Sequence, residues 1–165
     1  STCIELLLQN KVDFIISNLP NPKITKKMNV DEIFSFNDIF IANKEFKELE
    51  NNITTLKKLK EYPLLMLESK TTTRQFFENT LKKAGIEIEA AVELGSVDLL
   101  IEMTKIGLGI SLIPEYSLEL KNQGLFEVKT NEKLPTRKLA VVKMKNIPLS
   151  KAAEEFLQII KNKTS

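Results

Sequence analysis

The stretch that decides the fold lies at residues 91–114 and reads AVELGSVDLLIEMTKIGLGISLIP. Ser96 is a candidate helix N-cap, because its hydroxyl can accept an unpaired backbone N–H of the first helical turn. The apolar residues after it have helical spacing, and Gly107 can adopt the left-handed conformation that ends a helix. Residues 109–113 then form an apolar run closed by Pro114, which is typical of a buried strand. Strand, short helix and strand in such close succession indicate a tight βαβ crossover.

The rest of the chain continues this alternation. Helices are predicted at 2–9, 56–61, 74–83, 97–106 and 115–121, with a last helix after Ser150. Strands are predicted at 12–17, 29–34, 38–42, 64–67, 86–93, 109–113, 125–128 and 138–143. Thr72 or Thr73 is expected to cap the helix over 74–83, and Gly85 to end it. The mixed order of helices and strands indicates an α/β protein.

Composition restricts the class of protein. The chain has 165 residues, 42% of them hydrophobic, which suffices for one domain or for two small lobes. The net charge of +2 does not indicate a nucleic-acid or membrane surface. A single cysteine excludes an internal disulfide and fits a reducing compartment. Since no long apolar run and no signal-peptide pattern is visible, we expect a cytoplasmic protein without a membrane partner.

No catalytic constellation is visible. The chain contains no histidine, the commonest general base and metal ligand. Cys3 therefore has no histidine partner that could activate it. The Gly107-Leu108-Gly109 segment is not a dinucleotide fingerprint, because the third glycine is missing and these glycines end a helix. We expect no enzyme activity, no cofactor and no metal.

The segment 68–74, which reads ESKTTTR, has the features of a ligand-binding loop. It follows a buried strand and enters a helix, and open α/β sheets bind ligands in loops at the carboxyl ends of strands. Hydroxyls and free N–H groups at a helix start can hold a carboxylate or phosphate, and Lys70 or Arg74 can add charge. The alternative is that Thr72 or Thr73 only caps the helix.

These features resemble the effector-binding domain of the LysR-type transcriptional regulators. Within the first stretch the resemblance is carried by Glu93, Ser96, Met103, Gly107, Gly109, Ile110 and Pro114. Segments 4–16 and 148–156 resemble further parts of that domain in the same order. Two positions depart from the usual pattern, since Ile106 stands where alanine is usual and Asn10 where glycine is usual.

The resemblance implies a two-lobed α/β fold like that of type 2 periplasmic binding proteins. Lobe I would hold residues 1–44 and 146–165, and lobe II would hold 45–145. The fold would be N-terminally truncated, lacking the family's winged helix-turn-helix and the first strand, helix and strand of the effector-binding domain.

The resemblance also implies a cleft between the lobes that binds a small, anionic effector. The residues expected to line it are Ser17, Asn18, Leu19, Ser69, Lys70, Thr71, Thr72, Thr73, Gly95 and Ser96. The chain would be the ligand-sensing domain of a bacterial transcription factor, with DNA contacted only through the missing N-terminal domain. A solute-binding protein of a transport system and, less favoured, a small-molecule enzyme of similar fold are the alternatives.

In the family, the surface formed here by the helix at 72–84 and the strand at 86–93 pairs with its counterpart in the other lobe of a second subunit. The full-length protein is therefore expected to be a dimer or tetramer. Residues 1–165 keep one half of this interface, so alone they are expected to lose the family dimer.

Overall fold

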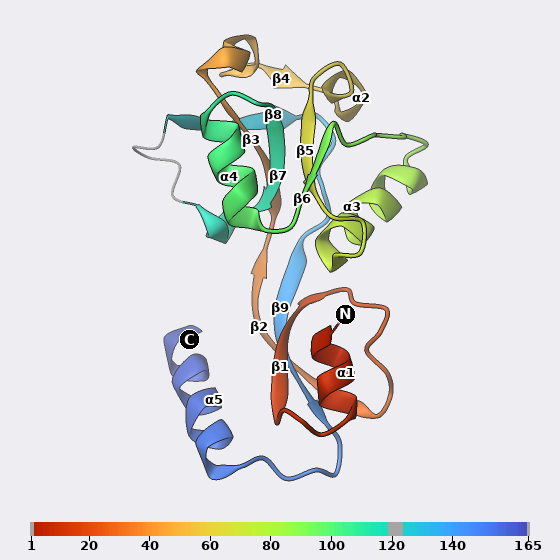
Figure 1. The fold of residues 1–165 in the computed structure, drawn as a ribbon, viewed down its shortest axis with the longest axis vertical. Coiled ribbons are helices and arrows are strands. Elements are labelled where there is room, and N and C mark those ends of the chain that lie inside the picture. Colours follow the sequence, from red (N-terminus) through yellow and green to blue (C-terminus); the bar gives the residue numbers. More distant parts are fainter. Residues whose placement is uncertain (1, 119–123, 165) are drawn as a thin grey trace. The chain divides into compact units, whose positions relative to one another are not determined.

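The computed structural model describes residues 2–118 and 124–164, which fold into two compact units (Figure 1). The first unit takes the chain up to Phe36 and again from Arg137 onward. The second unit is Asn37–Thr136. No helix in the described ranges is both long enough and apolar enough to span a bilayer.

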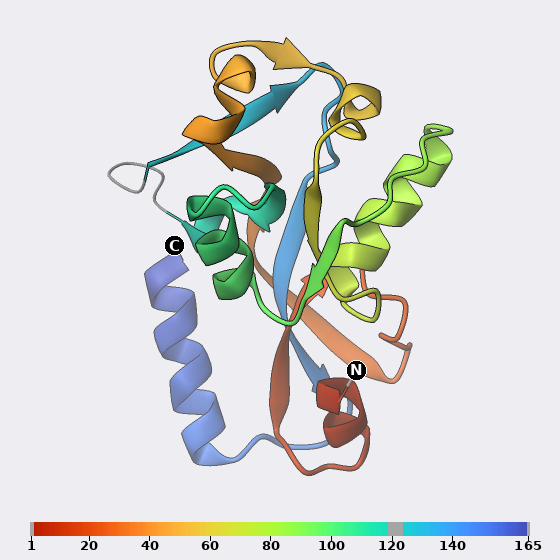
Figure 2. The same ribbon diagram turned by 45° about the horizontal axis from the view of Figure 1, so that its top comes forward.

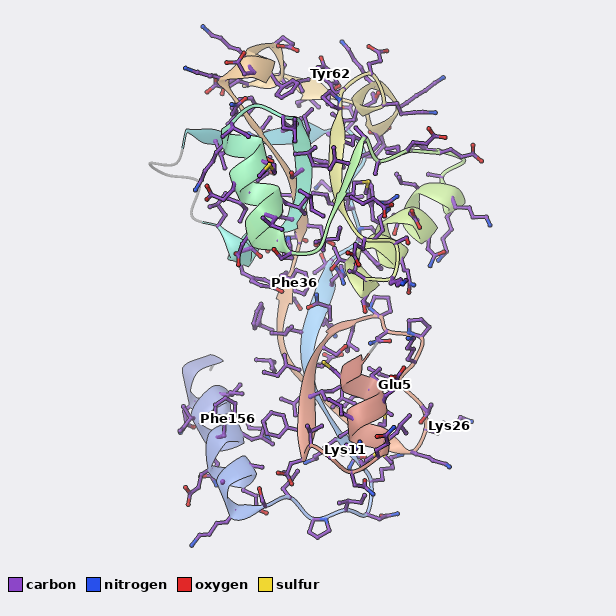
Figure 3. All side chains as sticks on the ribbon, in the orientation of Figure 1. Glu5, Lys11, Lys26, Phe36, Tyr62 and Phe156 are labelled. Atoms are coloured by element: carbon purple, nitrogen blue, oxygen red, sulfur yellow. The ribbon has the colours of Figure 1, made fainter. Side chains whose placement is uncertain are left out.

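The first unit is built on a three-stranded antiparallel sheet. Its order is β1 (Phe14–Leu19), β9 (Arg137–Met144) and β2 (Met28–Phe36). Two helices, α1 (Thr2–Leu8) and α5 (Lys151–Thr164), pack on it. Ile15 faces the core with Ile4 and Leu7 of α1, whereas Phe14 stacks on Phe156 of α5, with ring centroids 5.9 Å apart (Figure 3). Because neighbouring strand residues point to opposite faces, the two helices cover opposite faces of the sheet.

The second unit is built on a six-stranded mixed sheet. Its strand order is β4 (Ile53–Thr54), β8 (Leu125–Thr130), β3 (Asp38–Asn43), β7 (Ile110–Pro114), β5 (Leu64–Leu67) and β6 (Val92–Leu94). Strand β3 is antiparallel to β7 and β8, whereas β5 is parallel to β7 and β6. The other elements are η1 (Lys44–Leu49), α2 (Leu56–Leu59), α3 (Thr72–Lys83), α4 (Val97–Lys105) and η2 (Glu115–Ser117).

Helices α3 and α4 cover opposite faces of this sheet (Figure 2). Phe40 of β3 belongs to the apolar core that contains Phe77 of α3. Its neighbour Ile41 belongs to a second core with Leu100 of α4. The two cores lie on the two faces, because residues 40 and 41 alternate across the strand.

The compact units change over at 36/37 and 136/137, whereas the lobes expected from the sequence change over at 44/45 and 145/146. Strand pairing explains why both boundaries between the units lie earlier in the chain than expected. Strand β3 pairs with β7 and β8 of the second unit, and β9 pairs with β1 and β2 of the first. Hydrogen bonds between residues far apart in the chain therefore determine the unit to which each strand belongs.

Several predicted elements differ from the observed ones by a few residues at their ends, and two differ more. The strand predicted at 86–93 is reduced to β6, because the neighbouring β5 offers only four residues for pairing. Before β6, the Ala91 N–H still donates to the Leu64 carbonyl over 2.8 Å. The helix predicted at 115–121 is only the short η2, and residues 119–121 lie outside the described residues.

Candidate functional site

The candidate site lies at the edge of the six-stranded sheet where β5 and β6 end. These strands are parallel, with Leu67 opposite Leu94, so their following loops leave from the same edge (Figures 1 and 2). The N–H of Glu68 donates to the Leu94 carbonyl over 3.1 Å and extends the ladder into the first loop. Strand pairing thus brings the predicted 68–74 segment beside Gly95 and Ser96.

Helix α3 is capped by Thr71, not by Thr72 or Thr73 as predicted. The Thr71 Oγ1 accepts the Arg74 N–H over 3.3 Å and donates to the Glu68 carbonyl over 2.9 Å. The backbone of Thr71 is extended, as is usual for an N-cap, so the cap lies one or two residues earlier than predicted. The half-buried side chain of Thr72 is therefore not used as a cap. Thr73 is buried, with only 7% of its surface exposed.

Helix α4 begins as predicted. Ser96 has an extended backbone, and its Oγ accepts the Leu99 N–H over 3.3 Å. The preceding Gly95 is exposed, and a Cβ built there would lie 3.7 Å from Oε1 of Glu68, an ordinary contact. The loop that follows β6 therefore lies directly against the side chain of Glu68, which begins the loop that follows β5.

The edge combines positive helix ends with charges of both signs. The first turns of α3 and α4 leave N–H groups unpaired along the helix axis, which gives each start a partial positive charge. Lys70 is exposed in the first loop. Glu68, at the start of that loop, and Asp98, in the first turn of α4, are exposed carboxylates. An anion at this edge would meet favourable helix ends and one lysine but also two negative side chains.

The charge of Arg74 is paired with carboxylates of the second unit, although its position in the sequence suggests that it could add charge for a ligand. Its guanidinium contacts Glu78, Glu93 and the Leu67 carbonyl. No sequence pattern pairs a residue of α3 with one of β6, so this contact set could be found only from the structure. The two carboxylates compensate the positive charge of the guanidinium inside the protein.

The predicted site residues divide between the two units, and those of the second unit lie together at this edge. Those brought together at the edge are Ser69, Lys70, Thr71, Thr72, Thr73, Gly95 and Ser96. Ser17, Asn18 and Leu19 end β1 in the first unit. There, the Asn21 side chain donates to the Ser17 hydroxyl over 3.0 Å. Their participation in a shared site stays a prediction.

A separate hollow in the second unit contains none of the predicted residues. It has a volume of about 1110 Å³ and lies beside β3, β4 and β8. At its rim, the Asn37 N–H donates to Glu115 over 2.8 Å, and the Thr136 hydroxyl donates to the Asn37 side chain over 3.0 Å. Among the described residues, no group of three or more acidic, cysteine or histidine side chains could hold a metal ion.

Comparisons with known proteins agree on one family. The family model described as "LysR substrate binding domain" matches residues 1–165. The HTH-type transcriptional regulator EstR of Acinetobacter baylyi is 27% identical over 98% of this chain and 54% of its own length. The uncharacterized HTH-type transcriptional regulator YfeR of Shigella flexneri is 24% identical over 96% and 51%. The chain thus spans about half the length of the curated relatives it matches, which are named as transcriptional regulators and not as enzymes.

Solved structures show the same fold. The CcmR regulatory domain of Synechocystis PCC6803 in complex with 2-PG superposes with a TM-score of 0.85 at 20% identity, covering 98% of this chain and 77% of that one. The effector binding domain of QuiR in complex with shikimate superposes with a TM-score of 0.80 at 14% identity, covering 99% and 77%.

Proposed function

The chain belongs to the LysR substrate-binding domain family, and from this membership we propose that it senses a small-molecule effector for a LysR-type transcriptional regulator. Its α/β fold is the periplasmic-binding-protein-like fold of solved LysR regulatory domains. In this proposal ligand binding favours one arrangement of the domain, and that preference is passed to DNA-binding domains outside residues 1–165. No bond in the ligand is made or broken.

We infer that the effector carries an anionic group that binds at the edge where β5 and β6 end. The observation that carries this inference is the parallel pairing of Leu67 with Leu94, because it makes the loops that lead into α3 and α4 leave the sheet at the same edge. A carboxylate or phosphate there would accept N–H groups from both first turns. The Ser96 hydroxyl, although it accepts an N–H as the cap, retains a proton to donate to the ligand.

The charges at this edge also restrict the rest of the effector. The exposed Glu68 and Asp98 carboxylates would repel a second negative charge and can accept hydrogen bonds. We therefore expect one anionic group accompanied by hydroxyl or ammonium donors. Ser17, Asn18 and Leu19 are also proposed to contact the effector, and a homodimer or tetramer is proposed for the full-length regulator.

Calorimetric titration of the 165-residue chain tests the anionic site. The panel would pair 2-PG, shikimate and inorganic phosphate with neutral amides of similar size. We expect binding among the anions, and a Thr72→Ala/Ser96→Ala double variant to bind them roughly tenfold more weakly or worse, since each lost hydrogen bond to a charged group costs about 1.5–3 kcal/mol.

A matched control separates affinity from helix capping. Thr55 caps α2 as Ser96 caps α4, accepting the Lys58 N–H over 3.1 Å, but it lies on another helix. Thr55→Ala should lower stability by a similar amount and leave affinity unchanged. Binding of neutral or cationic molecules alone would contradict the anionic site.

A further inference from the structure

Arg74, a buried arginine, joins the elements that form the proposed binding edge. Arg74 lies in the first turn of α3 and is 6% exposed. Its Nη1 donates to the Leu67 carbonyl over 3.2 Å and lies 3.3 Å from Oε1 of Glu93, while its Nε donates to Glu78 over 2.7 Å. One guanidinium therefore links the last residue of β5, strand β6 and its own helix.

The chemistry of these contacts requires arginine. A guanidinium stays protonated at any physiological pH, and burying its charge is tolerated only where charged and polar partners surround it. Its planar fork presents donors in several fixed directions, whereas a lysine ammonium offers one compact donor group. Arg74 uses this geometry to donate to Glu78 and to the Leu67 carbonyl, and its Nη1 also forms an ion pair with Glu93. Leu67 and Glu93 belong to the adjacent strands that end at the site.

These contacts determine where the first loop lies. The Leu67 carbonyl that Arg74 holds belongs to the residue just before Glu68, whose N–H is bound to Leu94. The Glu68 carbonyl in turn accepts both the N–H and the hydroxyl of Thr71, the cap of α3. A displacement of Leu67 would therefore pass along the loop to the helix start.

We propose that Arg74 is a positioning residue of the effector site: it holds the 68–71 loop and the start of α3 against β6 and does not itself contact the effector. This assignment rests on the proposed function, because that loop is the proposed effector site. It differs from the direct charge contribution that the position of Arg74 in the sequence suggests.

Amide hydrogen exchange on the 165-residue chain tests the assignment without a ligand. In Arg74→Lys, which keeps the charge but loses the fork, the N–H groups of Glu68 and Thr71 should exchange about tenfold faster or more. The N–H of Ile110, which donates to the Pro63 carbonyl over 2.9 Å in the same unit, reports on global opening and should stay unchanged. Arg74→Met should show the same local effect, enlarged.

A matched control removes a lysine from an exposed ion pair. Lys105 lies 2.8 Å from Glu102 on α4, and Lys105→Met should leave the exchange of all these amides unaltered. Unchanged exchange at Glu68 and Thr71 in Arg74→Lys would overturn the assignment. An acceleration that Ile110 shares equally would also overturn it, because Arg74 would then only stabilise the whole unit.

Titration with inorganic phosphate distinguishes this assignment from the proposed function. If the unaltered chain binds phosphate, Arg74→Lys should bind it about tenfold more weakly, in step with the faster local exchange. If the unaltered chain binds none of the anions while exchange at Glu68 and Thr71 still accelerates, the positioning role stands and the anionic site is refuted.

Discussion

Replacing Gly109 by alanine should destabilise the second unit more than replacing a glycine that has free space around its Cα. A Cβ at Gly109 would lie 2.3 Å from the carbonyl oxygen of Pro63 and 3.0 Å from Cδ2 of Leu65. The same carbonyl accepts the Ile110 N–H over 2.9 Å. Because the nearest atom belongs to the backbone, it cannot rotate away, and the main chains beside β5 and β7 must separate.

The size of the effect follows from these contacts. Forcing extra atoms into a packed interior costs about 1–3 kcal/mol. Weakening the Ile110 hydrogen bond adds about 1 kcal/mol, and the lower chain entropy of the unfolded alanine variant returns about 0.4–1 kcal/mol. Together these contributions lower the free energy of unfolding by about 1–3.6 kcal/mol, and because the clashing atom belongs to the backbone we expect Gly109→Ala to lie in the upper part of this range, about 2–3 kcal/mol.

Urea denaturation followed by circular dichroism measures this difference. With a urea dependence of about 1–3 kcal/mol per molar for a small protein, the midpoint should fall by about 1 M or more. Gly85 is the matched control: its φ is +69°, but no atom lies within 4 Å of a built Cβ. Gly85→Ala should therefore cost only about 1–2 kcal/mol for the left-handed backbone. A Gly109→Ala loss below about 0.5 kcal/mol, or no larger than that of Gly85→Ala, would refute the reasoning.

Two further predictions concern polar side chains of the second unit. Asn43 is buried; its Nδ2 donates to the Lys105 carbonyl over 3.0 Å, and its Oδ1 accepts the Glu45 N–H over 3.0 Å. Asn43→Ala should cost about 1–3 kcal/mol in urea denaturation, and Asn43→Asp, which keeps only the acceptor, should also destabilise; equal stability of all three proteins would contradict this. Burial and then the Glu48 carboxylate raise the pKa of Tyr62 above 10.0. The folded chain then holds the phenol proton more tightly than the unfolded chain, so this contribution to stability is lost as pH rises past about 10. NMR titration should show a lower Tyr62 pKa in Glu48→Gln, and an unchanged value would exclude the Glu48 contribution.

Several features of this protein were determined by short stretches of its sequence. The Ser96 hydroxyl caps α4 as predicted, and Gly107 follows that helix with a φ of +81°. The apolar run at 64–67 is a fully buried strand. Each signal depends on the chemistry of a few neighbouring residues, so it can be recognised without knowing what packs nearby. The order and spacing of these signals also sufficed to indicate the family.

Tertiary structure decided the features that depend on distant partners. Residues 86–91 were predicted to continue the strand, but strand residues need hydrogen-bond partners on a neighbouring strand, and of this segment only residues 92–94 pair with β5. The charge of Arg74 suggested a ligand contact, but in the fold its guanidinium donates to Glu78 and the Leu67 carbonyl and forms an ion pair with Glu93. Likewise, pairing of β3 and β9 with strands far away in the chain decided the unit to which each belongs. Strand pairing and the burial of charge are energies of contact between remote residues, and only the folded chain determines which residues those are.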